Sequence, residues 1–320
     1  MRIITSVIIG AVIICFLLSK INLNDIPKAI ANIPPQDIIL AFCLYTASVF
    51  FKAFRFKVIL RSEIGLRRIF SIVSLYMFFA NILPMRAGEL SYMYLLKKEA
   101  DTPGTKSFAS LIAGAIADAV LIFVVMFVVA WHLRVELVNR SIEILISNFL
   151  MSLIHKLTGL RLLIVLVIFL IIVFTCIILI RHYWRKRSFK YISIIKSKFI
   201  AIIQELGNTK FDTRLLAIIV FSIFIISFRF CTQWYVVRSM GLSVNIWQFT
   251  FAILFGILFS LVPIHGPAGF GTVEAPWVLA LVYLNVPEKD AITSGFSLHI
   301  VVILFCSILG LFGAIGLRKK

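Results

Sequence analysis

The sequence predicts an all-α polytopic membrane protein with about six transmembrane helices and two re-entrant helical hairpins, arranged as an inverted-topology repeat. Of its 320 residues, 61% are hydrophobic and the mean hydropathy is +1.06, whereas soluble domains are roughly 45–50% apolar. Several apolar runs reach the ~20 residues that an α-helix needs to cross about 30 Å of hydrocarbon. Two further apolar runs are interrupted by proline and glycine, and these predict the hairpins.

Six apolar runs are expected to cross the membrane. The first follows Arg2 as the core of a signal peptide would, but no small-residue cleavage site comes after it. We therefore interpret it as a retained helix. The six predicted crossings are Ile3–Leu18, Ile38–Phe56, Ser107–His132, Leu160–Ile180, Arg214–Val237 and Ala291–Leu317.

The two interrupted runs cover about residues 70–96 and 247–284. Pro84 and Gly88 break the first run, and a Pro/Gly-rich segment at 263–271 breaks the second. Each half holds only about a dozen apolar residues, too few for a complete crossing. A pair of short helices that enters and leaves on the same side fits both runs.

The distribution of basic residues supports this layout. With a cytoplasmic N-terminus and two re-entrant hairpins, most lysines and arginines fall on the cytoplasmic side, as the positive-inside rule requires. They lie in residues 52–68, 97–106, 181–214 and 318–320. If either hairpin crossed completely, the clusters that follow it would face outward. We therefore expect a multi-pass protein of the cell (inner or plasma) membrane with cytoplasmic N- and C-termini.

The layout contains an internal symmetry. Residues 1–159 are predicted to form two helices, a hairpin and a helix, and residues 160–320 repeat this order with the hairpin entering from the opposite side. Such an inverted repeat is common in transporters. The triplet FRF occurs at 54–56 and again at 228–230, late in the second helix of each half.

Composition argues against several classes of function. The net charge of +18 could indicate a nucleic-acid partner, but the basic residues flank apolar runs, so we expect none. The cysteines lie in or near apolar runs without CxxC spacing, which is typical of packing residues rather than of disulfides or metal ligands. We found no nucleotide-binding glycine loop and no metal-ligand cluster. The sequence therefore predicts no cofactor and no metal.

The first interruption, NILPMRAGEL, places charged residues inside an apolar run. Irregular backbone within a membrane is tolerated only where protein or a water-filled cavity satisfies it. Pro84 can begin the returning helix, whose free N–H groups would face such a cavity, with Gly88 in its first turn. Arg86 and Glu89 would share one face of that turn. A helix N-terminus beside an arginine forms an anion site suited to a phosphate.

The second interruption, PIHGPAGFGTVEAPW, repeats this pattern from the other side. Gly269 and Gly271 provide the turn, and Glu274 lies in the first turn of the following helix. His265 lies at the same tip, where a hydrogen-bonded loop residue is favoured over a proton-transfer role. For Glu89 and Glu274 the alternative to a functional role is helix capping, but charges within a bilayer commonly mark a pathway.

Three more ionisable residues fall near or inside predicted crossings. Arg55 could extend to the cytoplasmic surface. Arg229 lies well inside its helix, so it needs a partner such as Glu89, Glu274 or a ligand phosphate. For Asp118, close packing and a salt bridge to an arginine are equally compatible with the sequence.

The segments FKAFRFKVIL, ILPMRAGEL and PIHGPAGFGTVE occur in this order. Together they resemble the transmembrane, flippase-like domain of lysylphosphatidylglycerol synthases and their stand-alone relatives, over nearly the whole chain. Two motifs carry the resemblance. The P-x-R-x-G-E motif is matched by Pro84, Arg86, Gly88 and Glu89, and the G-x-G-x-x-E motif by Gly269, Gly271 and Glu274.

The resemblance implies translocation of a phospholipid or a lipid-linked headgroup between leaflets, through a cavity bounded by the two hairpins. The sequence departs from the family in two ways. No soluble aminoacyl-transfer domain follows, so lipid synthesis is not expected. Family members often have an arginine just before the aspartate of the helix after the first hairpin, whereas Ile116 and Ala117 precede Asp118 here.

We therefore expect a lipid translocase rather than an enzyme, which moves an anionic or aminoacylated phospholipid, or a lipid-linked sugar. Arg86, Arg229 and Arg55 would neutralise the phosphate, while Glu89 and Glu274 would pair with these arginines or bind a cationic headgroup. The alternatives are a membrane-embedded transferase acting on a lipid phosphate and a non-catalytic partner of a separate lipid or glycan synthase. The sequence leaves open a partner enzyme that modifies lipids or transfers sugars, and a homo-oligomer.

Overall fold

The computed structural model describes residues 2–83, 88–142, 213–242, 244–259 and 267–318. The chain divides into a large unit, Met1–Trp131 with Glu205–Lys320, and a small unit, His132–Gln204. All regular elements of the described residues are helices, in agreement with the predicted all-α class. They are α1 (Arg2–Leu18), α2 (Asp25–Ala31), α3 (Pro35–Leu60), α4 (Leu66–Ile82), α5 (Gly88–Ala100), α6 (Gly104–Ile142), α9 (Thr213–Ser239), α10 (Ile246–Phe259), η2 (Pro267–Gly269), α11 (Glu274–Tyr283) and α12 (Glu288–Arg318).

Four described segments are long and apolar enough to cross a membrane: Pro35–Leu60, Gly104–Val129, Arg214–Ser239 and Glu288–Arg318. They coincide with four of the six predicted crossings. A fifth, Ile3–Leu18, corresponds to α1, which has 17 residues. The sixth, Leu160–Ile180, lies outside the described residues, as does the predicted repeat boundary at residue 159.

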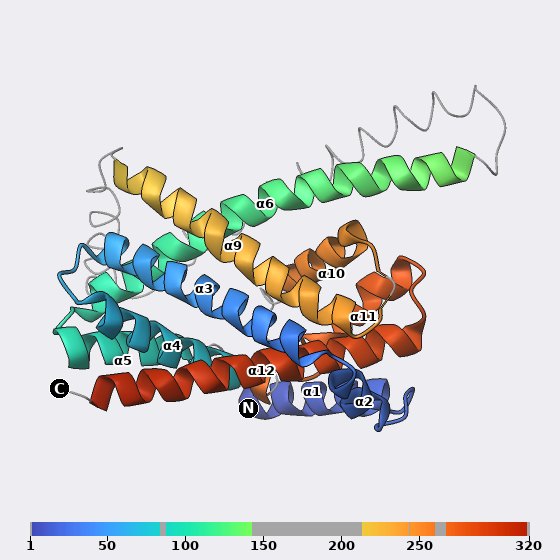
Figure 1. Cartoon of the computed structure of the whole chain (residues 1–320), viewed down its shortest axis with the longest axis horizontal. Helices are drawn as coiled ribbons and strands as arrows, with labels where there is room; N and C mark the ends of the chain where they lie inside the picture. The colour runs from blue at the N-terminus through green and yellow to red at the C-terminus, as the bar shows by residue number, and fades with distance from the viewer. Residues whose placement is uncertain (1, 84–87, 143–212, 243, 260–266, 319–320) are drawn as a thin grey trace, which may run out of the picture. The chain divides into compact units, whose positions relative to one another are not determined.

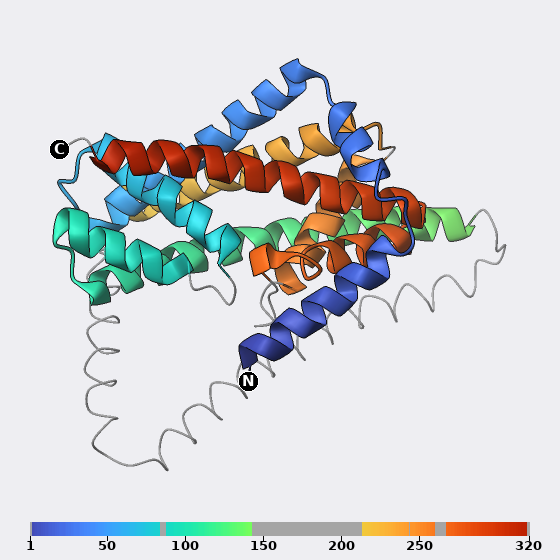
Figure 2. The ribbon, with the colours of Figure 1, turned by 90° about the horizontal axis from the view of Figure 1, so that it is seen from below.

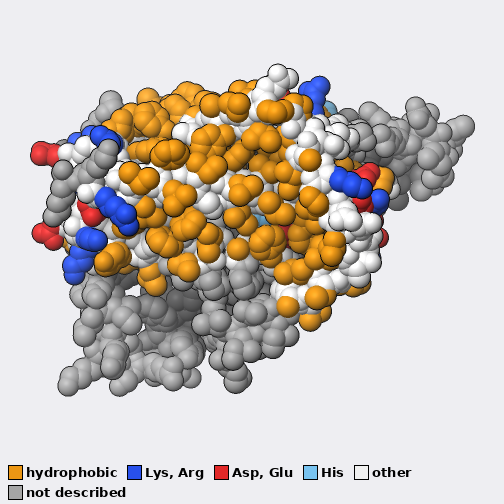
Figure 3. Space-filling model, turned by 60° about the horizontal axis from the view of Figure 1, so that its bottom comes forward, with side chains coloured by type: hydrophobic (Ala, Val, Ile, Leu, Met, Phe, Trp, Pro, Cys, Tyr) orange, Lys and Arg blue, Asp and Glu red, His pale blue; other side chains and the backbone are white. Residues whose placement is uncertain are grey.

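The membrane-facing character of the large unit appears on its surface. On the face in Figure 3, hydrophobic side chains form a broad band, and charged side chains gather at its two ends. Large exposed hydrophobic residues occur along α6, α9 and α12, among them Phe127, Phe224 and Leu311. In water, such an exposed apolar surface would promote aggregation, whereas the hydrocarbon of a membrane is an apolar solvent for it.

Helix α3 packs along α9, and α12 packs along α4. Aromatic rings that precede the two FRF triplets help to join α3 to α9, because Phe51 stacks on Phe224 with ring centroids 4.8 Å apart. Small residues let α12 approach α4 closely: a Cβ added at Gly310 would collide with Phe78, and one at Gly313 with the backbone of Ser71. Such small-residue contacts are the usual means of packing helices within membranes.

Both interrupted runs form helix pairs. The first comprises α4 and α5, and the second comprises α10 and α11, with the 3-10 turn η2 just before α11. Figures 1 and 2 show α4 on the C-terminal half of α12 and α11 on its N-terminal half. Pairs of packed helices therefore occupy both segments in which hairpins were predicted, at about 70–96 and 247–284.

Candidate functional site

The open end of the α4–α5 hairpin lies beside the C-terminal end of α12. Arg68 near the start of α4 faces Glu99 near the end of α5, with Nε and Oε2 3.8 Å apart. A Cβ added at Gly316, near the end of α12, would collide with the hydroxyl of Ser71. The two ends of this hairpin and the last turn of α12 therefore lie on the same side of the large unit.

The open end of the α10–α11 hairpin lies near the opposite end of α12. Gln248 at the start of α10 donates from Nε2 to the carbonyl oxygen of Leu284, at the end of α11, over 3.3 Å. Trp277 of α11 donates from Nε1 to Ser294 Oγ, in the first part of α12, over 3.2 Å. The two hairpins thus open toward opposite ends of α12.

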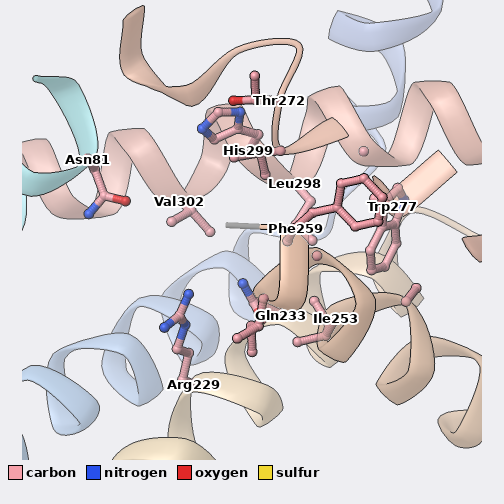
Figure 4. Close-up of a pocket in the computed structure, with 15 residues that line it drawn as sticks. Asn81, Arg229, Gln233, Ile253, Phe259, Thr272, Trp277, Leu298, His299 and Val302 are labelled. Carbon is pink, nitrogen blue, oxygen red and sulfur yellow. The ribbon is translucent and has the colours of Figure 1, made fainter. Parts of the chain in front are cut away.

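Helix α4 also contacts η2, the 3-10 turn just before α11. A cavity of about 190 Å³ lies between α4, α9, α10, α12 and the N-terminal part of α11 (Figure 4). Polar and charged residues that line it come from five parts of the chain. They are Asn81 on α4, Arg229 and Gln233 on α9, Thr272 before α11, Trp277 on α11 and His299 on α12. Apolar side chains from α10 and α12, such as Ile253 and Val302, complete the wall.

Arg229 brings positive charge to this cavity from within a candidate membrane-crossing helix. In Figure 4 its guanidinium points into the cavity, across from Val302. Arg229 forms no ion pair with an acidic residue in the part of the chain that the structure describes. A charged side chain at the centre of a bilayer costs at least about 2.5–3.5 kcal/mol on insertion scales, so this charge requires a solvated cavity or a ligand.

Glu274 is fully buried behind the cavity, and each of its two carboxylate oxygens has a hydrogen-bond partner. Its Oε2 accepts the backbone N–H of Gly271 at 2.7 Å, a capping contact at the start of α11. Its Oε1 lies 2.6 Å from Nδ1 of His299 on α12. Gly271 has φ +79° and Gly269 has φ +76°, so the turn uses the left-handed backbone that the glycines were expected to provide. The capping alternative is therefore observed, together with a histidine contact that capping does not require.

A second ion pair joins α3 to α6. Arg55, only 1% exposed, forms a bidentate pair with Asp118, and its Nη1 also donates to the hydroxyl of Ser222 on α9 over 2.7 Å. Arg55 therefore does not extend to the surface. Of the two possibilities for Asp118, the structure has the salt bridge to an arginine.

Arg55 and Asp118 line a separate pocket of about 240 Å³, together with Lys52 and Glu89. Glu89 thus faces the pocket at the first hairpin rather than the cavity that contains Arg229. Lys52 donates to Sδ of Met77 over 3.1 Å and lies 5.3 Å from the centroid of the Tyr76 ring. Gly88 packs directly against the backbone of Ala80, which holds α4 and α5 together beside this pocket.

The sequence-based site residues fall into three groups. Arg229, Gly269, Gly271 and Glu274 lie in or directly behind the cavity, whereas Arg55, Gly88, Glu89 and Asp118 lie at the first hairpin. Pro84, Arg86 and His265 lie outside the described residues. The expected pairing of Glu274 with an arginine is not what the structure has, because His299 occupies that position.

Sequence reasoning missed His299, Asn81 and Ser222. A signal existed for His299, since it is an ionisable residue inside the predicted crossing Ala291–Leu317, and such residues merit a functional hypothesis. Asn81 and Ser222 carry no comparable signal, because small polar residues often bond to their own helix backbone. Among the described residues there is no group of three or more His, Cys, Asp or Glu side chains able to hold a metal ion.

Long apolar helices around a polar cavity with a buried acid–base pair define a multi-pass helical membrane protein. Residues 3–310 match the family described as "Lysylphosphatidylglycerol synthase TM region", and the chain belongs to that family. The resemblance found in the motifs is thereby confirmed. A UPF0104 membrane protein of Methanocaldococcus jannaschii is 24% identical over 328 aligned residues, covering 98% of this chain and 94% of that protein. No solved structure shows a significant match.

Proposed function

We propose that this protein is a lipid translocase that moves an anionic or aminoacylated phospholipid, or a lipid-linked sugar, between the two leaflets of the cell membrane. The observation that carries the proposal is the Arg229 guanidinium, which faces a cavity lined by residues of both hairpins, inside a bundle of membrane-crossing length. Lipid phosphates are the anions that a cationic group at this depth would meet. A guanidinium can bind phosphate through two parallel hydrogen bonds.

The two hairpins supply the path in this proposal. Because they open toward opposite ends of α12, each would enter the membrane from a different side and turn back near its middle. A headgroup held by Arg229 would lie beside both hairpins. Movement of one hairpin would then open the cavity to one leaflet, and movement of the other would open it to the second leaflet.

Arg229 and the Arg55–Asp118 pair have distinct parts in this mechanism. Arg229 neutralises the phosphate, while Gln233, Asn81 and Thr272 offer neutral hydrogen-bonding groups around it. The Arg55–Asp118 pair positions α3 against α6, and Ser222 adds α9 to the same contact. The acyl chains would stay in the surrounding lipid throughout, so that only the headgroup needs a polar route.

Translocation can be tested in proteoliposomes that contain fluorescent phosphatidylglycerol, with a membrane-impermeant quencher added outside. Wild-type protein should let the quencher reach lipid from both leaflets. Arg229→Gln should slow this by about tenfold or more, since losing one charge-assisted contact costs roughly 1.5–3 kcal/mol. Arg238→Gln is the matched control, because Arg238 is an exposed arginine on the same helix that does not line the cavity.

The result also separates the alternatives. Equal rates for wild type and Arg229→Gln, with both proteins folded, would show that the cavity is not the path. No movement of phosphatidylglycerol or of an aminoacylated analogue by folded wild type would contradict translocation of these lipids. A non-catalytic partner of a separate synthase would then be favoured, unless a purified mixture with a group donor formed product and revealed a transferase.

A further inference from the structure

The Glu274–His299 pair is a buried acid and base in contact, and phosphate binding by Arg229 makes no direct use of it. The carboxylate is fully buried, the histidine side chain is 8% exposed, and Oε1 lies 2.6 Å from Nδ1. The ring of His299 lines the cavity, so one partner reaches the ligand space and the other lies behind it. The two residues therefore form a buried pair of an acid and a base that is reached from the cavity through His299.

Within the described parts of the chain, few charged and titratable groups lie around the pair. Glu274 comes from α11 and Arg229 from α9, whereas α4 contributes only the neutral Asn81 to this cavity and α10 only apolar residues and Gly256. The ring of Phe270, after η2, lies 4.7 Å from the His299 ring. On α3, Tyr45 packs on Phe305 farther along α12. From α2, Asp25 is paired with Lys289 at the start of α12.

We infer that the cavity takes up a proton together with its anionic headgroup, and that the Glu274–His299 pair is the site of that proton. This inference rests on the proposed function. With the cavity empty, the positive charge of Arg229 opposes a second positive charge on the imidazole. A bound phosphate neutralises Arg229, so that the imidazolium becomes favourable between the phosphate and the Glu274 carboxylate.

The coupling must be reciprocal. If the anion favours protonation of His299, then the proton strengthens anion binding by the same factor. The affinity for the lipid should therefore be higher at low pH than at high pH. The change approaches about tenfold per pH unit if uptake of one proton is fully coupled to binding. In a vesicle, the lipid and the proton would move together, so a proton gradient could drive net movement.

The coupling can be measured by titrating the purified full-length protein with dihexanoyl phosphatidylglycerol in a calorimeter. The phosphodiester of this probe does not titrate between about pH 6 and pH 8, where histidine does. Measurements in two buffers of different ionisation enthalpy give the number of protons taken up per bound lipid. Wild type should take up a substantial fraction of one proton. His299→Gln, which can still donate to Glu274 but cannot hold a proton here, should take up none and bind with little pH dependence.

Thr272→Val is the matched control, because Thr272 lines the same cavity but does not titrate. This variant should take up as many protons per bound lipid as wild type, whether or not its affinity for the lipid changes. Binding by wild type with no proton uptake in either buffer would overturn the inference, while leaving translocation through the cavity intact. Failure of folded wild type to bind or move the lipid at any pH would overturn both. A wild-type proton count of zero overturns the inference whether or not the His299→Gln variant folds.

Discussion

The pockets beside the two hairpins differ in how their charged residues are paired. At the first hairpin, the pocket is lined by two basic and two acidic residues, Lys52, Arg55, Glu89 and Asp118. Arg55 is already engaged by Asp118 and Ser222. At the second hairpin, Arg229 faces the cavity, and the described carboxylate nearest to that cavity, Glu274, is bound by His299.

This difference teaches that a charge inside a membrane protein does not indicate function by itself. At the first hairpin, the Arg55 guanidinium is paired with Asp118, and this ion pair joins α3 to α6. An arginine that faces a cavity without an acidic partner retains its capacity to bind an anion. Under the proposed function, the first site positions helices and the second binds the ligand.

The largest effect on stability is expected from Asp118→Asn. It removes the partner of a buried arginine and should destabilise the protein by about 3–5 kcal/mol. Thermal unfolding in detergent measures the change, and Glu63→Gln, at an exposed position before α4, is the control. The double variant Arg55→Met/Asp118→Leu should recover much of the loss and should still translocate lipid. A stable double variant that is inactive would show that Arg55 contacts the lipid directly.

Gly88→Ala should have an intermediate effect, because the new Cβ would overlap the backbone of Ala80 and force α4 and α5 apart. Overpacking of this kind costs about 1–3 kcal/mol. Gly65→Ala is the matched control, since a Cβ at Gly65 meets nothing within 4 Å. Equal melting temperatures for the two variants would indicate that Gly88 does not pack directly against the backbone of Ala80.

The smallest effect is expected from Lys52→Met. Lys52 contacts a thioether and an aromatic ring in the first pocket, and a cation–π contact is worth about 0.5–1 kcal/mol at exposed sites and about 2 kcal/mol when desolvated. The translocation rate should stay within about twofold of wild type, because Lys52 lines the pocket at the first hairpin and not the cavity that contains Arg229. A loss comparable to that of Arg229→Gln would move the ligand site, or a second one, to the first hairpin.

Much of the fold could be predicted because membranes impose simple rules on sequence. The length of the apolar runs predicted the four candidate membrane spans of the described residues. Proline and glycine predicted where both helix pairs are interrupted. The positive turn angles of Gly269 and Gly271 followed from residue type. These features depend on local composition, which a single sequence displays.

Partner choice could not be predicted in the same way. Sequence reasoning offered arginine partners for Glu274, but the histidine that contacts it lies 25 residues later on another helix. Likewise, the Arg55–Asp118 contact spans 63 residues, and Asp118 was left with two interpretations. Which charges meet depends on how α3, α6, α11 and α12 rotate about their own axes, and packing of the whole bundle sets that rotation.

Helix α12 touches elements of both hairpins along its 31 residues, a length of about 46 Å at 1.5 Å per residue. Under the proposed translocation, this helix would act as a lever that couples the two hairpins. Tilting it about its middle, near Val302, would press one hairpin inward while releasing the other. Simultaneous opening of both sides, which would leak ions across the membrane, would then be disfavoured by the stiffness of a single helix.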